Sequence, residues 1–241
     1  KTMLLYLLLT NLLARGNRVI FIDPLGTCFD LIMQWFAYIT REFYRREDAQ
    51  FKWFQTEVLP NILFFDLSQE DHPYRSNMLQ GFPGETLSGT INRLVLFFDS
   101  LFSSMEIELQ RRQGLVNIVA LFVATQTPME RARDFLYNQN FREAILRQAE
   151  LQSSLSQVHL AIKYWQFVGE TYRGSSYGDK IFSLLTGLNQ FDESQSVSNF
   201  LLTGECNINW QDIFEHKSLF IKIQANSLPV RKVFMNYLYS G

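Results

Sequence analysis

The chain has 241 residues, of which 47% are hydrophobic and 19% are charged, and its formal net charge is −2. This composition excludes a disordered chain, and it supplies no global basic field of the kind that attracts nucleic acid. Cys28 and Cys206 lie far apart and lack metal-ligand spacing, so we expect two reduced thiols in a cytoplasmic chain. No apolar window is long enough to predict a membrane-spanning helix, so any attachment to the inner face of a membrane would need segments outside this sequence.

The chain opens with Lys1 and Thr2, at the start of an apolar run that predicts a buried helix over residues 2–15. A helix N-terminus presents free N–H groups and the positive end of a dipole, so a lysine and a threonine placed there suit a phosphate ligand. The alternative is a solvated lysine followed by a threonine that caps the helix. Gly16 marks the expected end of this helix.

A pattern typical of a parallel sheet follows the first helix. Residues 18–22 are a continuous β-branched and aromatic run, which predicts a strand buried on both faces and ending at Asp23. Residues 29–46 have helical periodicity, and residues 62–67 predict a second strand with Asp66 near its end. The order strand, helix, strand is typical of an α/β fold.

The middle of the sequence predicts helices alone, at residues 87–102, 107–125, 128–152, 155–172 and 179–202. A strand returns at 218–223, after a short helical turn at 209–214, and a further helix begins near Pro229. We therefore expect an α/β core, an all-helical insertion and a return to the core, over residues 1–79, 80–205 and 206–241.

Four landmarks, taken in order, resemble the HerA/FtsK group of P-loop ATPases, which includes the coupling proteins of type IV secretion. They are the Lys-Thr helix start, the Asp-Pro-x-Gly turn at 23–26, the strand and His-Pro loop at 62–79, and the late turn and strand at 210–223. This resemblance covers nearly the whole chain. It implies an α/β fold, a P-loop NTPase (RecA-like) parallel sheet with a large all-helical insertion, here truncated inside the Walker A loop and before the Walker B strand.

The resemblance implies an ATP-driven DNA translocase or conjugative coupling ATPase that works as a homo-oligomeric ring, with DNA and secretion-system or relaxosome proteins as partners. Its cofactors would be ATP and Mg²⁺. Lys1 would hold the β- and γ-phosphates, and the Thr2 hydroxyl would bind the metal ion. Asp23 would lie at the sheet edge where ligands bind and would orient water or the Mg²⁺ shell. The alternative for Asp23 is a side chain that starts the turn before Pro24.

Two other functions fit the same sequence. The first is a non-catalytic helical interaction or assembly module with a degenerate ATPase core. The second is a P-loop kinase of small molecules, against which the long helical insertion and the missing basic lid motif argue. No His, Cys and Asp cluster has the spacing of a dedicated metal site, so the nucleotide-bound Mg²⁺ is the metal that we expect.

Overall fold

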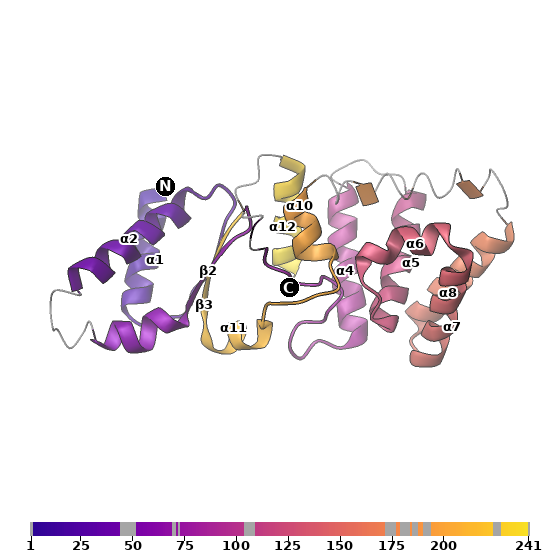
Figure 1. Ribbon diagram of the computed structural model, residues 1–241, viewed down its shortest axis with the longest axis horizontal. Coiled ribbons are helices and arrows are strands. Elements are labelled where there is room, and N and C mark those ends of the chain that lie inside the picture. The colour runs from indigo at the N-terminus through magenta and orange to yellow at the C-terminus, as the bar shows by residue number, and fades with distance from the viewer. Residues whose placement is uncertain are drawn as a thin grey trace. The chain divides into compact units, whose positions relative to one another are not determined.

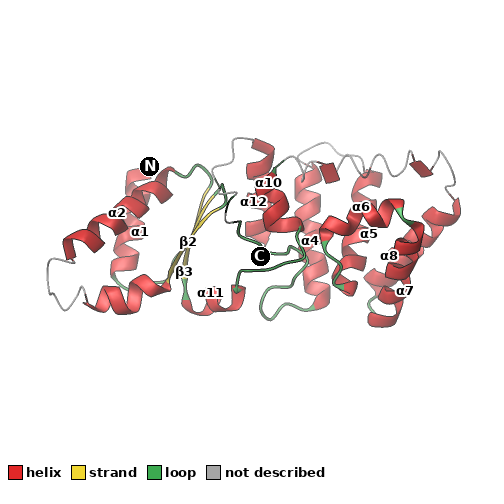
Figure 2. Ribbon diagram, viewed as in Figure 1, coloured by secondary structure: helices red, strands yellow, loops and turns green. Residues whose placement is uncertain are grey.

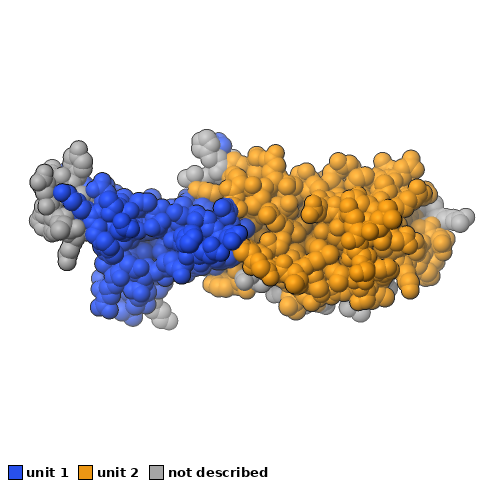
Figure 3. All heavy atoms as spheres, turned by 90° about the horizontal axis from the view of Figure 1, so that it is seen from below, with its two compact units in different colours: residues 1–72, 209–231 blue, residues 73–208, 232–241 orange. Residues whose placement is uncertain are grey.

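The structure is a computed structural model in which the chain forms two compact units (Figure 1; Figure 3 colours the units). Unit 1 comprises residues 1–72 and 209–231, and unit 2 comprises residues 73–208 and 232–241. The structure describes residues 2–43, 52–68, 71, 73–103, 109–171, 177–178, 184, 188–189, 194–223 and 228–240, which leaves Lys1 and His72 outside the described residues. The predicted division after residues 79 and 205 differs slightly from these boundaries and stays a prediction.

Unit 1 is built on three parallel strands, β1 (Ile20–Asp23), β2 (Ile62–Asp66) and β3 (Ser218–Lys222), in the spatial order β1-β3-β2 (Figure 2). Its helical elements are α1 (Thr2–Ala14), α2 (Thr27–Phe43), the short turns η1 (Phe54–Val58) and η2 (Leu59–Asn61), and α11 (Trp210–His216). The predicted strands and helices of this part are confirmed to within a few residues where the structure describes them, while residues 44–46 of the helix predicted over 29–46 lie outside the described residues. The short apolar runs between turn residues were sufficient to locate them.

A row of three phenylalanines crosses one face of the sheet. Phe21, Phe220 and Phe64 are partners in the strand register, with ring centroids 6.1 Å apart for the first pair and 5.4 Å for the second. Phe36 of α2 packs edge-on against Phe64 at 5.3 Å, and Leu13 of α1 belongs to the same buried cluster. Both α1 and α2 therefore contribute to the core on this face, which fixes where α2 begins relative to the strand ends.

The regular secondary structure of unit 2 is entirely helical within its described residues. Its elements are α4 (Leu87–Ser103), α5 (Leu109–Thr125), η3 (Met129–Arg131), α6 (Ala132–Tyr137), α7 (Gln139–Gln152), α8 (Ser156–Thr171), α10 (Gln195–Val197), η4 (Ser198–Leu202) and the part of α12 (Leu228–Ser240) from Lys232 onward. Helix α5 is central, because it contacts α4, α7 and α8, and it is buried on every side from Ile118 to Val123. Phe122, Phe135 and Trp165 form a chain of edge-on aromatic contacts that joins α5, α6 and α8.

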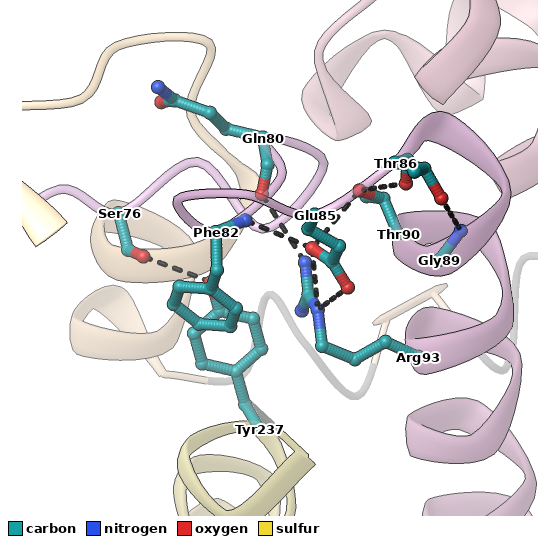
Figure 4. Close-up of polar contacts among 9 residues, drawn as sticks. All are labelled: Ser76, Gln80, Phe82, Glu85, Thr86, Gly89, Thr90, Arg93 and Tyr237. Carbon is teal, nitrogen blue, oxygen red and sulfur yellow. Dashed lines mark hydrogen bonds and ion pairs between the residues drawn. The ribbon is translucent and has the colours of Figure 1, made fainter. Parts of the chain in front are cut away.

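A buried ion pair holds the loop before α4 (Figure 4). The Arg93 guanidinium donates through Nε to both carboxylate oxygens of Glu85, at 3.0 and 3.3 Å, and lies 4.5 Å from the centroid of the Phe82 ring. Glu85 also accepts hydrogen bonds from the Phe82 amide and the Thr90 hydroxyl. Every oxygen of this carboxylate therefore has a donor, which is the condition for a buried charge to be tolerated.

The predicted P-loop NTPase fold with a RecA-like sheet is wrong. The structure is 70% helical, and its described residues form a single sheet of three short parallel strands, whereas a P-loop NTPase core would need a larger sheet. The reason lies in the βαβ pattern, which fixes the direction of neighbouring strands but not how many strands the sheet contains. Two or three apolar runs fit a large sheet and a small one equally well.

Candidate functional site

The three strands end together in charged residues. The strand register aligns Asp23 of β1 with Lys222 of β3, and Lys222 with Asp66 of β2. Parallel strands bring their carboxyl ends to one edge of a sheet, and in open α/β sheets this is the edge where ligands bind. A fourth charged residue, Asp30, comes from the first turn of α2. We call these four residues, Asp23, Asp30, Asp66 and Lys222, the carboxyl edge.

Lys222 forms ion pairs with two residues of the carboxyl edge, Asp30 and Asp66. Its Nζ donates to Asp30 Oδ1 at 2.9 Å and lies 3.4 Å from Asp66 Oδ2. The Lys222 side chain is 12% exposed, that of Asp66 is 18% exposed and that of Asp30 is 52% exposed. Burial by itself would lower the pKa of Lys222, but hydrogen bonds and charge from Asp30 and Asp66 outweigh it and raise the pKa above its usual value. The ammonium group is therefore firmly charged at neutral pH.

The Asp23 carboxylate caps the N-terminus of α2. Its Oδ2 accepts hydrogen bonds from the amides of Cys28 and Phe29, both at 2.8 Å, and its Oδ1 accepts one from the Leu25 amide at 3.1 Å. The side chain is buried, and its negative charge lies at the positive end of the α2 dipole. This geometry is the turn-forming arrangement that the sequence left open as the alternative. Burial, and then the Asp23 charge, raise the pKa of the neighbouring Cys28 thiol.

Asp66 is oriented by the residues that follow it. Its Oδ1 accepts hydrogen bonds from the Ser68 amide at 3.0 Å and the Ser68 hydroxyl at 2.5 Å, while Oδ2 faces Lys222. Each oxygen thus has its own partner, so the carboxylate is held in one orientation. Oxygen atoms fixed in this way suit a hard cation such as Mg²⁺. Within the described part of the chain, no group of three or more His, Cys, Asp and Glu side chains has an arrangement that could hold a metal ion.

Thr2 is the first described residue of α1 and is exposed. The start of α1 lies on the same side of unit 1 as the carboxyl ends of the strands (Figure 1). This placement follows from the topology, because α1 ends just before β1 begins and both contribute to one core. The roles predicted for Lys1 and Thr2 toward phosphate and Mg²⁺ stay predictions, as does the role of Asp23 toward a nucleotide.

The sequence did not identify Lys222 or Asp30 as site residues. A signal for Lys222 was present, since a lysine closes an otherwise apolar strand that is buried along its length. Asp30 could be placed only once β3 was known to lie between β1 and β2. Pairing order within a sheet is decided by tertiary packing, and local residue patterns do not encode it.

Comparisons with family models, curated proteins and solved structures gave no significant match to this chain. The resemblance to the HerA/FtsK group therefore rests on the order of four motifs in the sequence. None of the helices in the described ranges combines the length and apolar character that a membrane crossing requires. The predicted cytoplasmic location goes further than this finding and stays a prediction.

Proposed function

We propose that the carboxyl edge of unit 1 binds the phosphates of Mg²⁺-ATP, as part of an ATP-driven DNA translocase. The observation that carries the proposal is the register that aligns Asp23, Lys222 and Asp66 at the ends of three parallel strands. Ligands of α/β sheets bind at this edge, and a helix N-terminus on the same side adds free amide groups for an anion.

The charges of the edge favour a metal-bound nucleotide over a free phosphate. Three amides and the α2 dipole already compensate Asp23. Asp30 and Asp66 then share the single ammonium of Lys222, which leaves one excess negative charge. A bare phosphate would be repelled by this charge, whereas Mg²⁺ would be attracted to it and would bridge it to phosphate oxygens. Thr2 would supply a hydroxyl to the metal ion, and Lys1 would hold the phosphates.

In this proposal the chain contributes binding and positioning, which are the main requirements for phosphoryl transfer. DNA is the polymer that the proposed translocase moves, and a homo-oligomeric ring is the proposed assembly. The formal net charge of the whole chain is −2, so the chain as a whole has no dominant basic charge. DNA contact is therefore proposed for local basic side chains rather than for a general electrostatic field.

The test is calorimetric titration of ATP, with and without Mg²⁺, into the chain. We expect Mg²⁺-dependent binding that weakens at least about tenfold in Lys1→Ala and in Thr2→Ala, since each removes a charge-assisted or metal contact. Lys52→Ala and Thr56→Ala are the matched controls, because both residues are exposed outside the carboxyl edge. Absence of binding by the folded protein, or equal binding by the Lys1 and Thr2 variants, would refute the proposal.

One observation favours a second function, that of an assembly module. Helix α1 carries no charged residue from Thr2 to Ala14, and it exposes a leucine-rich face that includes Leu4, which is 74% exposed, Leu7 and Leu8. A helix that is apolar on every side is normally covered. We propose a second copy of the chain as its cover. Leu4→Glu with Leu8→Glu should convert an oligomer to a monomer in analytical ultracentrifugation, and Leu151→Glu, at an exposed leucine of α7, is the control.

A further inference from the structure

Unit 2 contains a cavity of about 710 Å³. Its walls come from α7, α8, the end of α6 and Tyr177, and its lining includes Arg142, Glu143, Trp165, Gly169, Glu170 and Tyr177. Small-molecule sites in proteins have volumes of roughly 300–1,000 Å³, and the volume of this cavity lies in that range, with charged and amide side chains beside aromatic ones in its lining. It lies wholly within unit 2 and is independent of the carboxyl edge.

A buried cation lines the cavity. Arg142 is 8% exposed, and its Nη1 donates to the carbonyl oxygens of Phe135 and Leu136, both at 3.1 Å. Its Cζ lies 5.0 Å from the centroid of the Tyr177 ring. No carboxylate among the described residues forms an ion pair with this guanidinium, whose neighbours there are the two carbonyl oxygens and the Tyr177 side chain. A buried charge that lacks a counter-charge is unfavourable, so an anion in the cavity would be stabilised there.

Two carboxylates line the same cavity without neutralising Arg142. Glu143 accepts a hydrogen bond from Gln139 at 2.8 Å and lies 3.7 Å from Arg147 on the outer side of α7. Glu170 comes from the last turns of α8. The cavity therefore presents a positive group and negative groups that are separate from each other. A ligand with a single charge would satisfy one and be repelled by the other, whereas a zwitterion matches both.

The remaining walls suit an apolar or aromatic side chain. Trp165 and Tyr177 supply ring surface, and Trp165 is fully buried with its Nε1 unpaired among the described residues. Gly169 is an exposed residue of the lining, and a Cβ added at this position would meet no atom within 4 Å. Glycine is a poor helix former, and no atom near Gly169 excludes a larger residue. What glycine provides at this position is the absence of a side chain.

We propose that this cavity binds a small zwitterion with an apolar or aromatic side chain, of the class of free α-amino acids. The carboxylate of the ligand accepts hydrogen bonds from Arg142, its ammonium group faces Glu170, and its side chain packs against Trp165 and Tyr177. No bond is made or broken in this binding. The cavity is thus a site at which a small metabolite can stabilise the packing of α6, α7 and α8.

The test uses L-phenylalanine as the probe and the indole N–H signal of Trp165 as the reporter, recorded by ¹H–¹⁵N NMR on the 241-residue chain. Trp165 is the only tryptophan of unit 2, and Trp165→Phe assigns its signal. We expect a saturable shift with L-phenylalanine, and binding about tenfold weaker with phenylalaninamide or N-acetylphenylalanine, which each lack one charge. No shift with L-phenylalanine, or equal binding of all three probes, overturns the proposal.

Two variants make the test specific to the cavity. Gly169→Leu adds an apolar side chain to the lining at a position where a Cβ meets no atom within 4 Å, and it should abolish the shift while the circular dichroism spectrum stays unchanged. Glu170→Gln should weaken binding of L-phenylalanine but not of the N-acetyl probe, and Glu150→Gln, at an exposed position of α7 outside the lining, should change neither. Unaltered binding in Gly169→Leu places the probe elsewhere and overturns the assignment. Arg142 is not substituted, because its bonds to Phe135 and Leu136 also support the fold.

Discussion

Arg93 and Glu85 form an ion pair with both side chains largely withdrawn from water: they are 6% and 17% exposed, and 3.0 Å separates Nε from Oε1. Removing one partner leaves a buried charge without its counter-charge. We expect Glu85→Ala to lower the free energy of unfolding by about 3 kcal/mol, measured by urea denaturation. Glu205→Ala breaks the exposed pair with Arg75 and should cost less than about 1 kcal/mol. Equal costs for the two variants would contradict the role given to burial.

The same pair predicts a pH dependence. Burial alone would raise the pKa of the Glu85 carboxyl, but hydrogen bonds from Arg93, the Phe82 amide and Thr90, with the Arg93 charge, hold the pKa below its usual value. Because the folded pKa is depressed, the stabilisation is complete above the unfolded pKa of about 4.3 and is lost as the pH falls through the folded value. The difference in unfolding free energy between wild type and Glu85→Gln should therefore shrink below pH 4. A difference that stays constant from pH 7 to pH 3 would exclude this contribution.

Capping by Asp23 predicts a loss of stability in unit 1. Asp23→Ala removes the acceptor of three backbone amides at the buried start of α2, and we expect a cost of about 2 kcal/mol. Asp23→Asn keeps one oxygen acceptor and should cost about half as much. The comparison is Asn209→Ala, which removes an exposed cap of α11 and should cost about 0.5–1 kcal/mol. Thermal unfolding of the three variants measures the order, and a smaller loss for Asp23→Ala than for Asn209→Ala would disagree with the geometry.

Lys222 has two carboxylate partners, and burial predicts which coupling is stronger. Asp30 lies closer to Lys222 Nζ but is half-exposed, whereas Asp66 is farther and largely buried. Water screens the first pair more, so double-mutant cycles with Lys222→Met should give a coupling of about 0.5 kcal/mol for Asp30→Asn and about 1–2 kcal/mol for Asp66→Asn. The reverse order would show that distance outweighs screening at this edge.

Gly16 and Gly84 offer a matched pair of backbone positions. Both have positive φ, 74° and 78°, but a Cβ at Gly16 would lie 3.2 Å from the Trp53 ring, whereas a Cβ at Gly84 would meet nothing within 4 Å. Alanine at Gly84 should cost about 1 kcal/mol through backbone strain alone. Gly16→Ala should cost more, by about a further 1 kcal/mol, and should change the fluorescence of Trp53. Equal costs would mean that the ring moves away freely.

The sequence predicted the elements better than it predicted their assembly. Apolar periodicity located α1, α2 and the long helices of unit 2, and short β-branched runs located the three strands. The size of the sheet was wrong, because strand patterns describe single segments and not how many segments pair. Of the candidate site, Asp23 was found from its position at a strand end, while Lys222 needed the knowledge that β3 is the central strand.

The cavity in unit 2 could not be predicted from the sequence, for a related reason. Arg142 lies on the same face of α7 as the buried residues Ile145, Leu146 and Ala149, but this spacing does not indicate that its guanidinium donates to the carbonyl groups that end α6. Such a contact joins residues six or seven positions apart across a break between two helices, where helical periodicity no longer applies. Charge patterns in sequence predict surface faces by default, so a buried arginine is recognised only from three-dimensional contacts.

The position of β3 at the centre of the sheet also constrains the order in which unit 1 can be completed during synthesis. Asn61 and Lys217, which are hydrogen-bonded beside the starts of β2 and β3, are 156 residues apart in the chain. During synthesis on the ribosome, β1 and β2 emerge long before β3, the strand with which both of them pair. The backbone groups that will pair with β3 therefore stay unpaired while the helices of unit 2 are made. The helices of unit 2 between residues 73 and 208 have local contacts and can form in that interval, but residues 232–241, which also belong to unit 2, are made after β3, so neither unit can be complete before residues 218–241 have emerged.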